Sequence, residues 1–293
     1  MSKPRRRPTA RADEIEIRPA RRRMRARFSA ATADRHELYQ IAVQSPEADL
    51  AFLRRVSRRW NRREPRHLRE DFCGTAFLCA TWVRREGCTA EGFDLDPEPL
   101  TWGAVHNIEP LGARAARVRL HQKDVRARSH VAPDIRVAQN FSYWVFRERK
   151  LLLEYFRSAR ADLAPGGLFA IDVYGGPDAT DDIEDARRVE GGFTYVWEQA
   201  RYLPGNAEYS CHIHFRFQDG SEMRWAFTYH WRFWNLPELR DLLLEAGFHR
   251  VETWFEQTEE GDREGQGNGS FALDETGETC SDCAAWVAYL IAF

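Results

Sequence analysis

The chain has 293 residues, of which 43% are hydrophobic and 30% are charged, and its formal net charge is −2. This composition is ordinary for a globular protein and gives the whole chain no balance toward binding polyanions. There is no apolar run near the roughly 20 residues of a membrane span, no secretory signal and no disulfide-framework spacing of the cysteines, so we expect a cytoplasmic protein that does not enter a membrane.

The first 33 residues predict a basic, disordered tail. Arginine clusters at 5–7 and 21–27 stand among prolines and alanines with almost no apolar periodicity, a composition typical of disorder. Such a tail is also a candidate for binding RNA through its phosphates, although no nucleic-acid module accompanies it. Apolar periodicity begins after Asp34, so we predict one folded domain over 34–293.

Residues 34–66 predict a pair of helices. Leu38, Ile41 and Ala42 have helical spacing, and Ser45-Pro46 then supplies an N-cap and a first helical residue for a second helix. We expect these helices to form an N-terminal lid that packs over the ligand cleft of the domain and excludes water from it.

Strands and helices alternate over the next hundred residues. The helical stretches are 76–85, 97–107 and 147–163, and five short strands are predicted at 67–72, 89–94, 118–122, 135–140 and 168–173. This alternation is typical of right-handed βαβ units, which build a parallel sheet.

The period changes to two after the fifth strand. Strands are predicted at 193–199, 208–218 and 222–233, and the turn 218–221 joins the last two. We interpret 193–234 as an antiparallel insert, 236–246 as a helix, 248–255 and 284–293 as two final strands, and the acidic segment 257–282 as a loop. The predicted fold class is therefore α/β: a Rossmann-like, seven-stranded, mostly parallel sheet with helices on both faces, plus the antiparallel β insert.

Three strand ends carry residues suited to binding a nucleoside. Gly74 lies in the turn after the first strand, where a glycine lets a ligand approach the backbone and the helix N-terminus. Asp94 ends the second strand about 20 residues on, where an acid accepts hydrogen bonds from both ribose hydroxyls. Asp124 ends the third, where an acid can receive the exocyclic amine of adenine. Because ligands of open α/β sheets bind beyond these strand ends, we expect the three residues in one site.

Five segments in order resemble the motifs of class I S-adenosylmethionine-dependent methyltransferases, over about residues 68–175. They are 70–76, 92–94, 123–125, 139–144 and 163–167. The pattern of a helix, Leu-Ala-Pro-Gly-Gly and a strand is the most specific of them. The resemblance implies a Rossmann-like methyltransferase fold, S-adenosylmethionine as cofactor and methyl transfer as the reaction.

The resemblance also implies the roles of the cofactor-binding residues. The methionine end of the cofactor is expected at Glu70, Cys73, Gly74 and Thr75. The ribose is expected at Asp94, the adenine at Leu95, Asp124 and Val125, and the sulfonium beside Asn140. Arg69 and Tyr39 are candidate partners for the cofactor carboxylate. The sequence departs from the family at the cofactor loop, where Phe72 and Ala76 stand at places usually held by glycine.

The insert and its neighbours supply the candidates for binding an acceptor. Tyr143 belongs to an Asn-Phe-Ser-Tyr segment that lacks both prolines of the related amine-methylating motif. The other candidates for contact with a substrate are Tyr39, Tyr229, His230 and Arg232. We name no catalytic nucleophile, because transfer from an activated sulfonium can rest on alignment and desolvation. A single CxxC pair, Cys280 and Cys283, predicts no metal site.

A methyltransferase acting on a small molecule is the function that the sequence favours. Two alternatives stay open. One is an RNA or protein methyltransferase that holds its substrate with the basic tail. The other is a protein that binds the cofactor without transferring its methyl group.

Overall fold

A computed structural model describes residues 28–258, 267–280 and 283–293. Its larger sheet has eight strands in the order β11-β10-β12-β5-β4-β1-β2-β3. The five that form the parallel part are β1 (His67–Asp71), β2 (Thr89–Asp94), β3 (Val118–Gln122), β4 (Ile135–Ala138) and β5 (Leu168–Gly175). They are the five strands that the alternating pattern predicts, so the parallel core of the predicted fold is confirmed.

Antiparallel strands complete the larger sheet beside β5. They are β12 (Trp286–Ala292), β10 (Val251–Thr258) and β11 (Gly267–Leu273). The last of these corrects two predictions, a loop over 257–282 and a sheet of seven strands. β11 is short and rich in glycine, but Phe271 and Leu273 pack against the core that lies under helix α2 (Pro46–Asn61), and this packing fixes it at the sheet edge.

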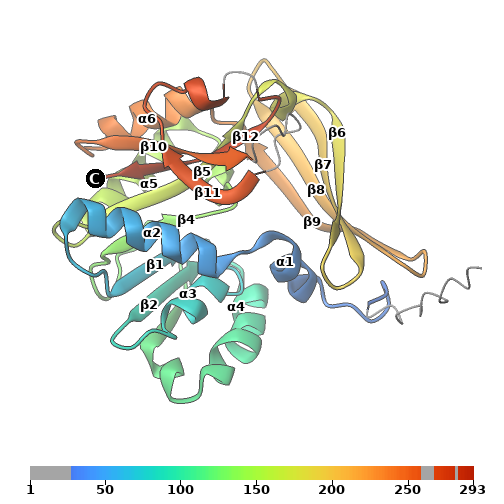
Figure 1. The fold of residues 1–293 in the computed structure, drawn as a ribbon, viewed down its shortest axis with the longest axis horizontal. Coiled ribbons are helices and arrows are strands. Elements are labelled where there is room, and N and C mark those ends of the chain that lie inside the picture. Colours follow the sequence, from blue (N-terminus) through green and yellow to red (C-terminus); the bar gives the residue numbers. More distant parts are fainter. Residues whose placement is uncertain (1–27, 259–266, 281–282) are drawn as a thin grey trace, which may run out of the picture.

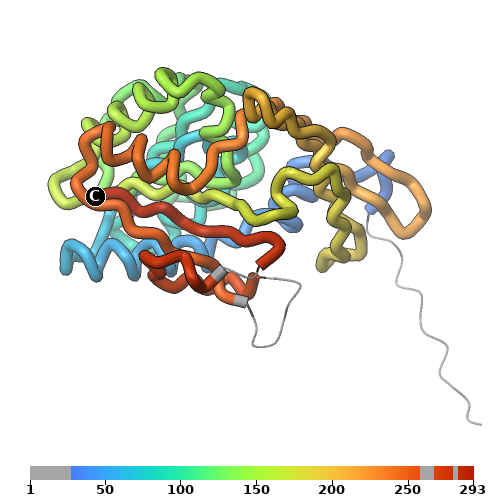
Figure 2. Tube along the Cα trace, turned by 90° about the horizontal axis from the view of Figure 1, so that it is seen from above, coloured from blue at the N-terminus to red at the C-terminus, as the bar shows by residue number. Residues whose placement is uncertain are grey.

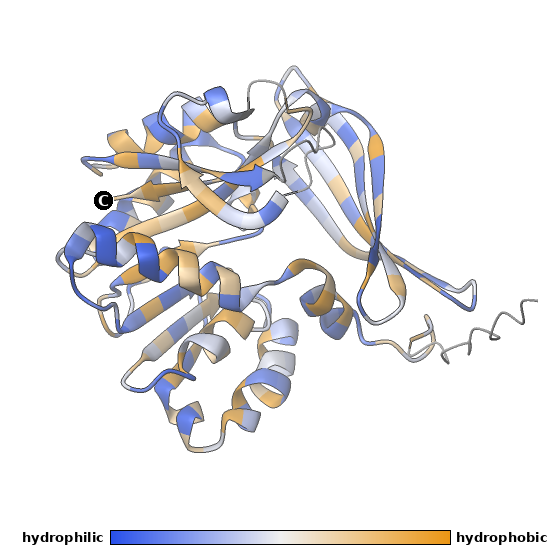
Figure 3. Cartoon of the chain, viewed as in Figure 1, coloured by the Kyte–Doolittle hydropathy of each residue, from blue (hydrophilic) through white to orange (hydrophobic). Residues whose placement is uncertain are grey.

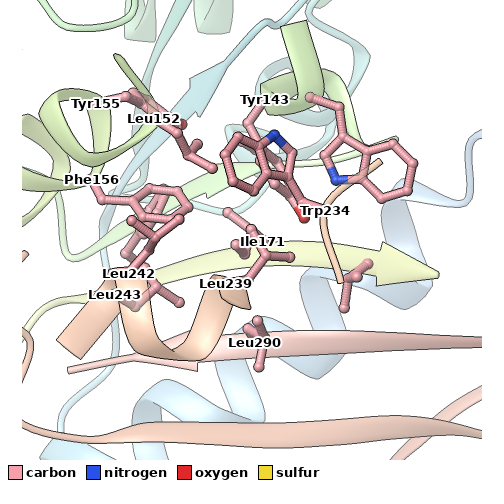
Figure 4. Close-up of a cluster of buried hydrophobic side chains, with 14 of the residues drawn as sticks. Tyr143, Leu152, Tyr155, Phe156, Ile171, Trp234, Leu239, Leu242, Leu243 and Leu290 are labelled. Carbon is pink, nitrogen blue, oxygen red and sulfur yellow. The ribbon is translucent and has the colours of Figure 1, made fainter. Parts of the chain in front are cut away.

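Helices cover both faces of this sheet (Figure 1). The α-helices are α1 (Arg35–Val43), α2 (Pro46–Asn61), α3 (Phe77–Trp82), α4 (Pro97–Gly103), α5 (Arg149–Asp162) and α6 (Leu236–Glu245). A π-helical turn lies at Ala104–Ile108, and 3-10 turns lie at Glu109–Arg117, Ser142–Val145, Pro177–Thr180 and Glu278–Cys280. One apolar core lies under α2 and α3, and a second joins α5 and α6 to the other face. Figure 4 shows this second core, where Trp234 and Leu239 meet Ile171 of β5. None of the helices in the described residues is long and apolar enough to cross a membrane.

The predicted insert is a four-stranded antiparallel sheet that extends from one end of the larger sheet (Figures 1 and 2). Its strands are β6 (Ile183–Val189), β7 (Phe193–Leu203), β8 (Glu208–Phe217) and β9 (Glu222–Arg232). Figure 3 shows hydrophobic and hydrophilic residues alternating along them. Because β6 belongs to this sheet, the insert begins at Ile183, ten residues earlier than predicted. β6 was not predicted because it is an exposed edge strand of mostly charged residues, which is how sheets protect their edges.

The N-terminal helices have two different roles. Helix α1 bridges the two sheets, because Arg35 and His36 both contact Glu98 of α4, and Arg35 also donates to the carbonyl of Ala226 in β9. Helix α2 buries one side against the larger sheet and belongs to its core. Residues 1–27 of the predicted tail lie outside the described residues. Phe28, which was placed in that tail, is buried against Phe193 of the insert, so the ordered chain includes it.

Candidate functional site

Strand order places a binding site at the carboxyl ends of β1 and β4. The chain runs from β1 toward β2 and β3 on one side, and from β4 toward β5 on the other. At such a reversal the two loops leave the sheet in opposite directions and open a crevice between them. The loop 72–76 follows β1, and Gln139 and Asn140 follow β4, so both predicted binding segments border this crevice.

The loop after β1 has a conformation suited to several glycines, although Gly74 is the one glycine in residues 72–76. Phe72, Gly74 and Ala76 have φ angles of 54°, 49° and 53°, all in the left-handed region. Phe72 turns its ring toward Phe146 and Tyr155 on the α5 side. A side chain at Gly74 would meet nothing within 4 Å. The departure from the family pattern therefore changes the residues of this loop while the left-handed backbone is retained.

Asp94 ties this loop to the end of β2. Its Oδ2 accepts a hydrogen bond from the backbone N–H of Gly74 at 2.8 Å, and its Oδ1 accepts one from Asp96 at 2.9 Å. Burial raises the pKa of Asp94. Leu95 beside it is 65% exposed. Gly74 and Asp94 are thus joined by a hydrogen bond at the ends of β1 and β2, and Leu95 follows Asp94 directly.

The side chains of Glu70, Cys73 and Thr75 serve the scaffold of this loop. Glu70 accepts a hydrogen bond from the N–H of Cys79 in α3. Cys73 is 2% exposed and lies in the core beside Gly92, so its side chain is not available to line a cofactor as expected. Thr75 accepts a hydrogen bond from Gln40 of α1 at 2.7 Å, which fastens this helix to the loop.

Arg69 is not at the crevice, which corrects its assignment to the cofactor carboxylate. Successive strand residues point to opposite faces of a sheet, so Arg69 and Glu70 cannot serve the same side. Arg69 is fully buried on the α5 face, within a cluster of two arginines and two aspartates that we call the buried ion cluster. Its members are Arg69, Asp71, Arg136 and Asp162, joined at 2.7 Å (Arg69–Asp71), 2.6 Å (Arg136–Asp71) and 3.0 Å (Arg69–Asp162).

The buried ion cluster positions the loop that follows β3. Arg69 and Arg136 both donate to the carbonyl oxygen of Val125. Val125 is itself buried, so its side chain packs in the core. Asp124 is half-buried and forms a two-point ion pair with Arg126, which lowers its pKa. The loop follows β3, which pairs with β2, and the Asp124 carboxylate expected at the adenine already has a cationic partner.

Asp172 fixes the turn after β4 and was not predicted. Its carboxylate accepts hydrogen bonds from the backbone N–H groups of Asn140 and Phe141, at 2.6 and 3.0 Å. Both of these residues are left-handed, with φ of 56° and 57°. Tyr143 is fully buried and donates its hydroxyl to the carbonyl of Asp172, so its assignment to substrate contact is wrong. A lone acid within the apolar sequence of β5 was the available signal for Asp172.

The acceptor candidates divide between two faces of the insert. Tyr39 and Tyr229 share a hydrogen bond on the side of α1, and Tyr39 packs on Phe227. His230 is the next residue after Tyr229 on β9, so it lies on the opposite, exposed face. Arg232 pairs with Glu238 at 2.8 Å. The structure therefore brings Tyr39 and Tyr229 together and separates His230 and Arg232 from them.

Four acids around the crevice have no cationic partner among the described residues. We call Asp49, Glu70, Asp94 and Asp172 the cleft carboxylates. Burial raises the pKa of Asp49 to about 6, and those of Glu70 and Asp172 to about 7. Mutual repulsion adds to this rise, since Asp49 acts on both Glu70 and Asp172. A ligand that brings positive charge into the crevice would favour the ionised form of these acids.

No protein-family model and no curated protein sequence matches the chain. Solved structures do match it. The CcbJ methyltransferase from Streptomyces caelestis has a TM-score of 0.61 and 15% identity, over 86% of this chain and 98% of its own. DesVI from Streptomyces venezuelae has a TM-score of 0.61 and 17% identity, over 89% and 98%.

A third match is the SAM-bound CalS10 from Micromonospora echinaspora, an amino pentose methyltransferase, with a TM-score of 0.58 and 19% identity over 87% of this chain and 95% of its own. At these identities the likeness establishes the fold. The chain therefore has the Rossmann-like fold that the motif resemblance predicted, with an additional antiparallel sheet.

Proposed function

We propose that this chain binds S-adenosylmethionine and transfers its methyl group to a small-molecule acceptor. The observation that carries the proposal is the group of cleft carboxylates at the strand-order reversal, beside the left-handed loop around Gly74. S-adenosylmethionine has a sulfonium, an ammonium and one carboxylate, so its net charge is positive. The acids that are unpaired among the described residues complement this charge, whereas a dinucleotide would bring phosphates against them.

The residues present fit this cofactor. In this proposal Asp94 holds the ribose and the exposed Leu95 contacts the adenine, and the open space beside Gly74 supports close approach of the ligand. The left-handed turn at Asn140 and Phe141, held by Asp172, borders the same crevice. When bound, the cofactor supplies an activated methyl group. The protein's part is then to align the acceptor and exclude water, and no covalent residue is needed.

The insert and α1 support a small-molecule acceptor. Tyr39 of α1 and Tyr229 of the insert together form a partly buried aromatic surface. Gln40 fastens α1 to the loop 72–76 through its hydrogen bond to Thr75. Among similar structures CalS10 is an amino pentose methyltransferase, which also supports a small acceptor. An RNA or protein acceptor held by the basic residues of 1–27 remains an alternative, since those residues lie outside the described chain.

Two measurements test the proposal. Calorimetric titration with S-adenosylmethionine and S-adenosylhomocysteine should show binding, and no binding of either at millimolar concentration would refute it. Labelled methyl groups should then enter the small-molecule fraction of a cell extract. Label in the RNA or protein fraction would identify a macromolecular acceptor instead. Binding without label in any fraction would support a cofactor-binding protein without transfer activity.

A further inference from the structure

A small cavity lies between the start of α2 and the end of β4. Its volume is about 20 Å³, which is room for one group of the size of water or ammonium. It is lined by Gln44, Pro46, Asp49, Leu78, Gln139 and Asn140. Leu78 belongs to α3, which begins directly after the loop 72–76, so the cavity adjoins the end of the crevice where a methionine moiety is expected.

Hydrogen-bond acceptors predominate around this cavity. The Asp49 carboxylate accepts a hydrogen bond from the Tyr289 hydroxyl at 3.1 Å and another from Gln139. The side-chain nitrogen of Gln139 also donates to Tyr289, which leaves its amide oxygen as an acceptor. The amide oxygen of Gln44 is buried and has no hydrogen-bond partner. A buried acceptor of this kind is costly unless a donor reaches it.

Among the described residues, the ionisable groups that act most strongly on Asp49 are acids. The ionisable groups that act on it or on its partner Tyr289 are Glu256 of β10, Glu70 of β1 and Asp172 of β5. Within the described part of the chain, no lysine, arginine or histidine forms an ion pair with it. A cation from outside the chain would therefore stabilise the ionised form of this carboxylate.

We propose that Asp49 and Gln44 form a subsite for a primary ammonium group, with the Gln139 amide oxygen as a third acceptor. An ammonium has three N–H donors, and this set offers three oxygens around a cavity of its size. Resting on the proposed function, the ammonium is that of the methionine half of the cofactor. The same chemistry could hold an amine of the acceptor, and the test separates the two sources.

The test compares two ligands on the full-length protein by calorimetry. S-adenosylhomocysteine has the ammonium, whereas 5′-methylthioadenosine keeps the adenosine and sulfur but lacks the amino-acid half. Asp49→Asn should weaken binding of S-adenosylhomocysteine about 10- to 100-fold, as for loss of a charged hydrogen bond. It should leave the affinity for 5′-methylthioadenosine within about twofold. Gln44→Leu should act in the same direction with a smaller effect.

Glu47→Gln is the matched control. Glu47 lies in the same first turn of α2, but it is exposed and pairs with Arg84, so neither affinity should change. Thermal unfolding without ligand should show that Asp49→Asn is folded. Equal losses for both ligands, or no loss for either, would overturn the assignment of this subsite to the cofactor. If the wild-type chain binds neither ligand, the proposed function itself fails, and this subsite with it.

Discussion

The two faces of β1 differ in how their buried charged groups are paired. On the α5 face, the buried ion cluster matches two arginines with two aspartates, and its remaining donors reach carbonyl oxygens. On the α2 and α3 face and at the strand ends, the cleft carboxylates face one another with raised pKa values and no cation among the described residues. The first group is complete within the protein, while the second needs a partner.

This difference separates scaffold from site. A buried charge that is satisfied internally stabilises one arrangement of the chain, here the loop that carries Asp124 and Val125. A buried acid that lacks a cation is a cost to folding, and such groups concentrate at functional sites. The comparison therefore predicts that changes to the buried ion cluster act on stability, and that changes to the cleft carboxylates act on ligand binding.

The largest effect should come from Asp71. Asp71→Ala removes the carboxylate that holds Arg69, Arg136 and the Tyr155 hydroxyl, and it leaves two buried guanidinium groups under-satisfied. We expect the free energy of unfolding to fall by about 3–5 kcal/mol, measured by urea denaturation. Asp124→Ala, which breaks the half-exposed pair with Arg126, is the control and should cost less than about 1 kcal/mol. Similar losses of unfolding free energy in both variants would show that the buried ion cluster stabilises the protein no more than an exposed pair does.

Asp94→Ala should show the reverse pattern. Its side chain lies at the crevice, so the free energy of unfolding should change by less than about 1 kcal/mol, in the range of sites outside a core. Binding of S-adenosylhomocysteine should weaken by roughly 1.5–3 kcal/mol, for a lost hydrogen-bond acceptor that is charged. Calorimetry and urea denaturation of the same sample measure both. Unfolding of the variant, or an unchanged affinity, would make Asp94 a purely structural residue.

Two truncations test where the folded chain begins. Deleting residues 1–27, whose composition is typical of disorder, should leave stability unchanged. Deleting 1–33 also removes Phe28, which is 8% exposed, and the hydrogen bond from Ala30 to Ser221. That deletion should cost about 2 kcal/mol, the value of burying one phenylalanine. Phe28→Ala in the full chain should reproduce most of the loss. Equal stability of the two truncations would contradict this boundary.

The smallest predicted effect is that of pH on ligand affinity. Burial raises the pKa of Asp49 from 3.8 to about 6, so the acid is ionised at pH 8 and mostly protonated at pH 5. An ammonium binds the ionised form, so affinity for S-adenosylhomocysteine should fall about tenfold from pH 8 to pH 5. In Asp49→Asn this part of the dependence should disappear. A dependence of equal size in both proteins would assign it to another group.

The sign for stability is opposite. The folded state holds the Asp49 proton more tightly than the unfolded chain does, since its pKa is raised. This group therefore makes the ligand-free protein less stable as the pH rises from about 4 to about 6. Glu70 and Asp172, with pKa values raised to about 7, act in the same direction. As the pH rises, the affinity for S-adenosylhomocysteine should therefore increase, while the stability of the ligand-free protein should decrease.

Sequence reasoning was most successful where structure is local. The parallel strands and the residues Gly74 and Asp94 follow from apolar runs that end in a turn, and each lies within a few residues of its signal. Arg69 was misplaced because its neighbours in sequence belong to the site, while strand alternation turns it away. β6 was missed because it is mostly charged, and β11 because it is rich in glycine, and both depend on pairing with β7 and β10.

The residues that sequence reasoning missed depend on distant contacts. Asp49 meets Tyr289 across 240 positions of chain, and Asp172 reaches back to Asn140 and Phe141. In α2, Asp49 is one of several charged residues near a helix start, where an acid is expected in any case. Only the sheet order, with β12 beside β5 and β4 beside β1, brings these groups to one crevice.

Phe72 and Ala76 have a consequence for the entropy of this loop. A glycine samples many backbone conformations in an unfolded chain, whereas these two residues sample fewer. Each costs about 1–2 kcal/mol of left-handed strain when folded, and packing of the Phe72 ring and hydrogen bonds such as Gly74 to Asp94 offset it. The shape of the loop is thus held by contacts within the protein. A ligand that enters it loses less of its binding free energy to ordering the protein.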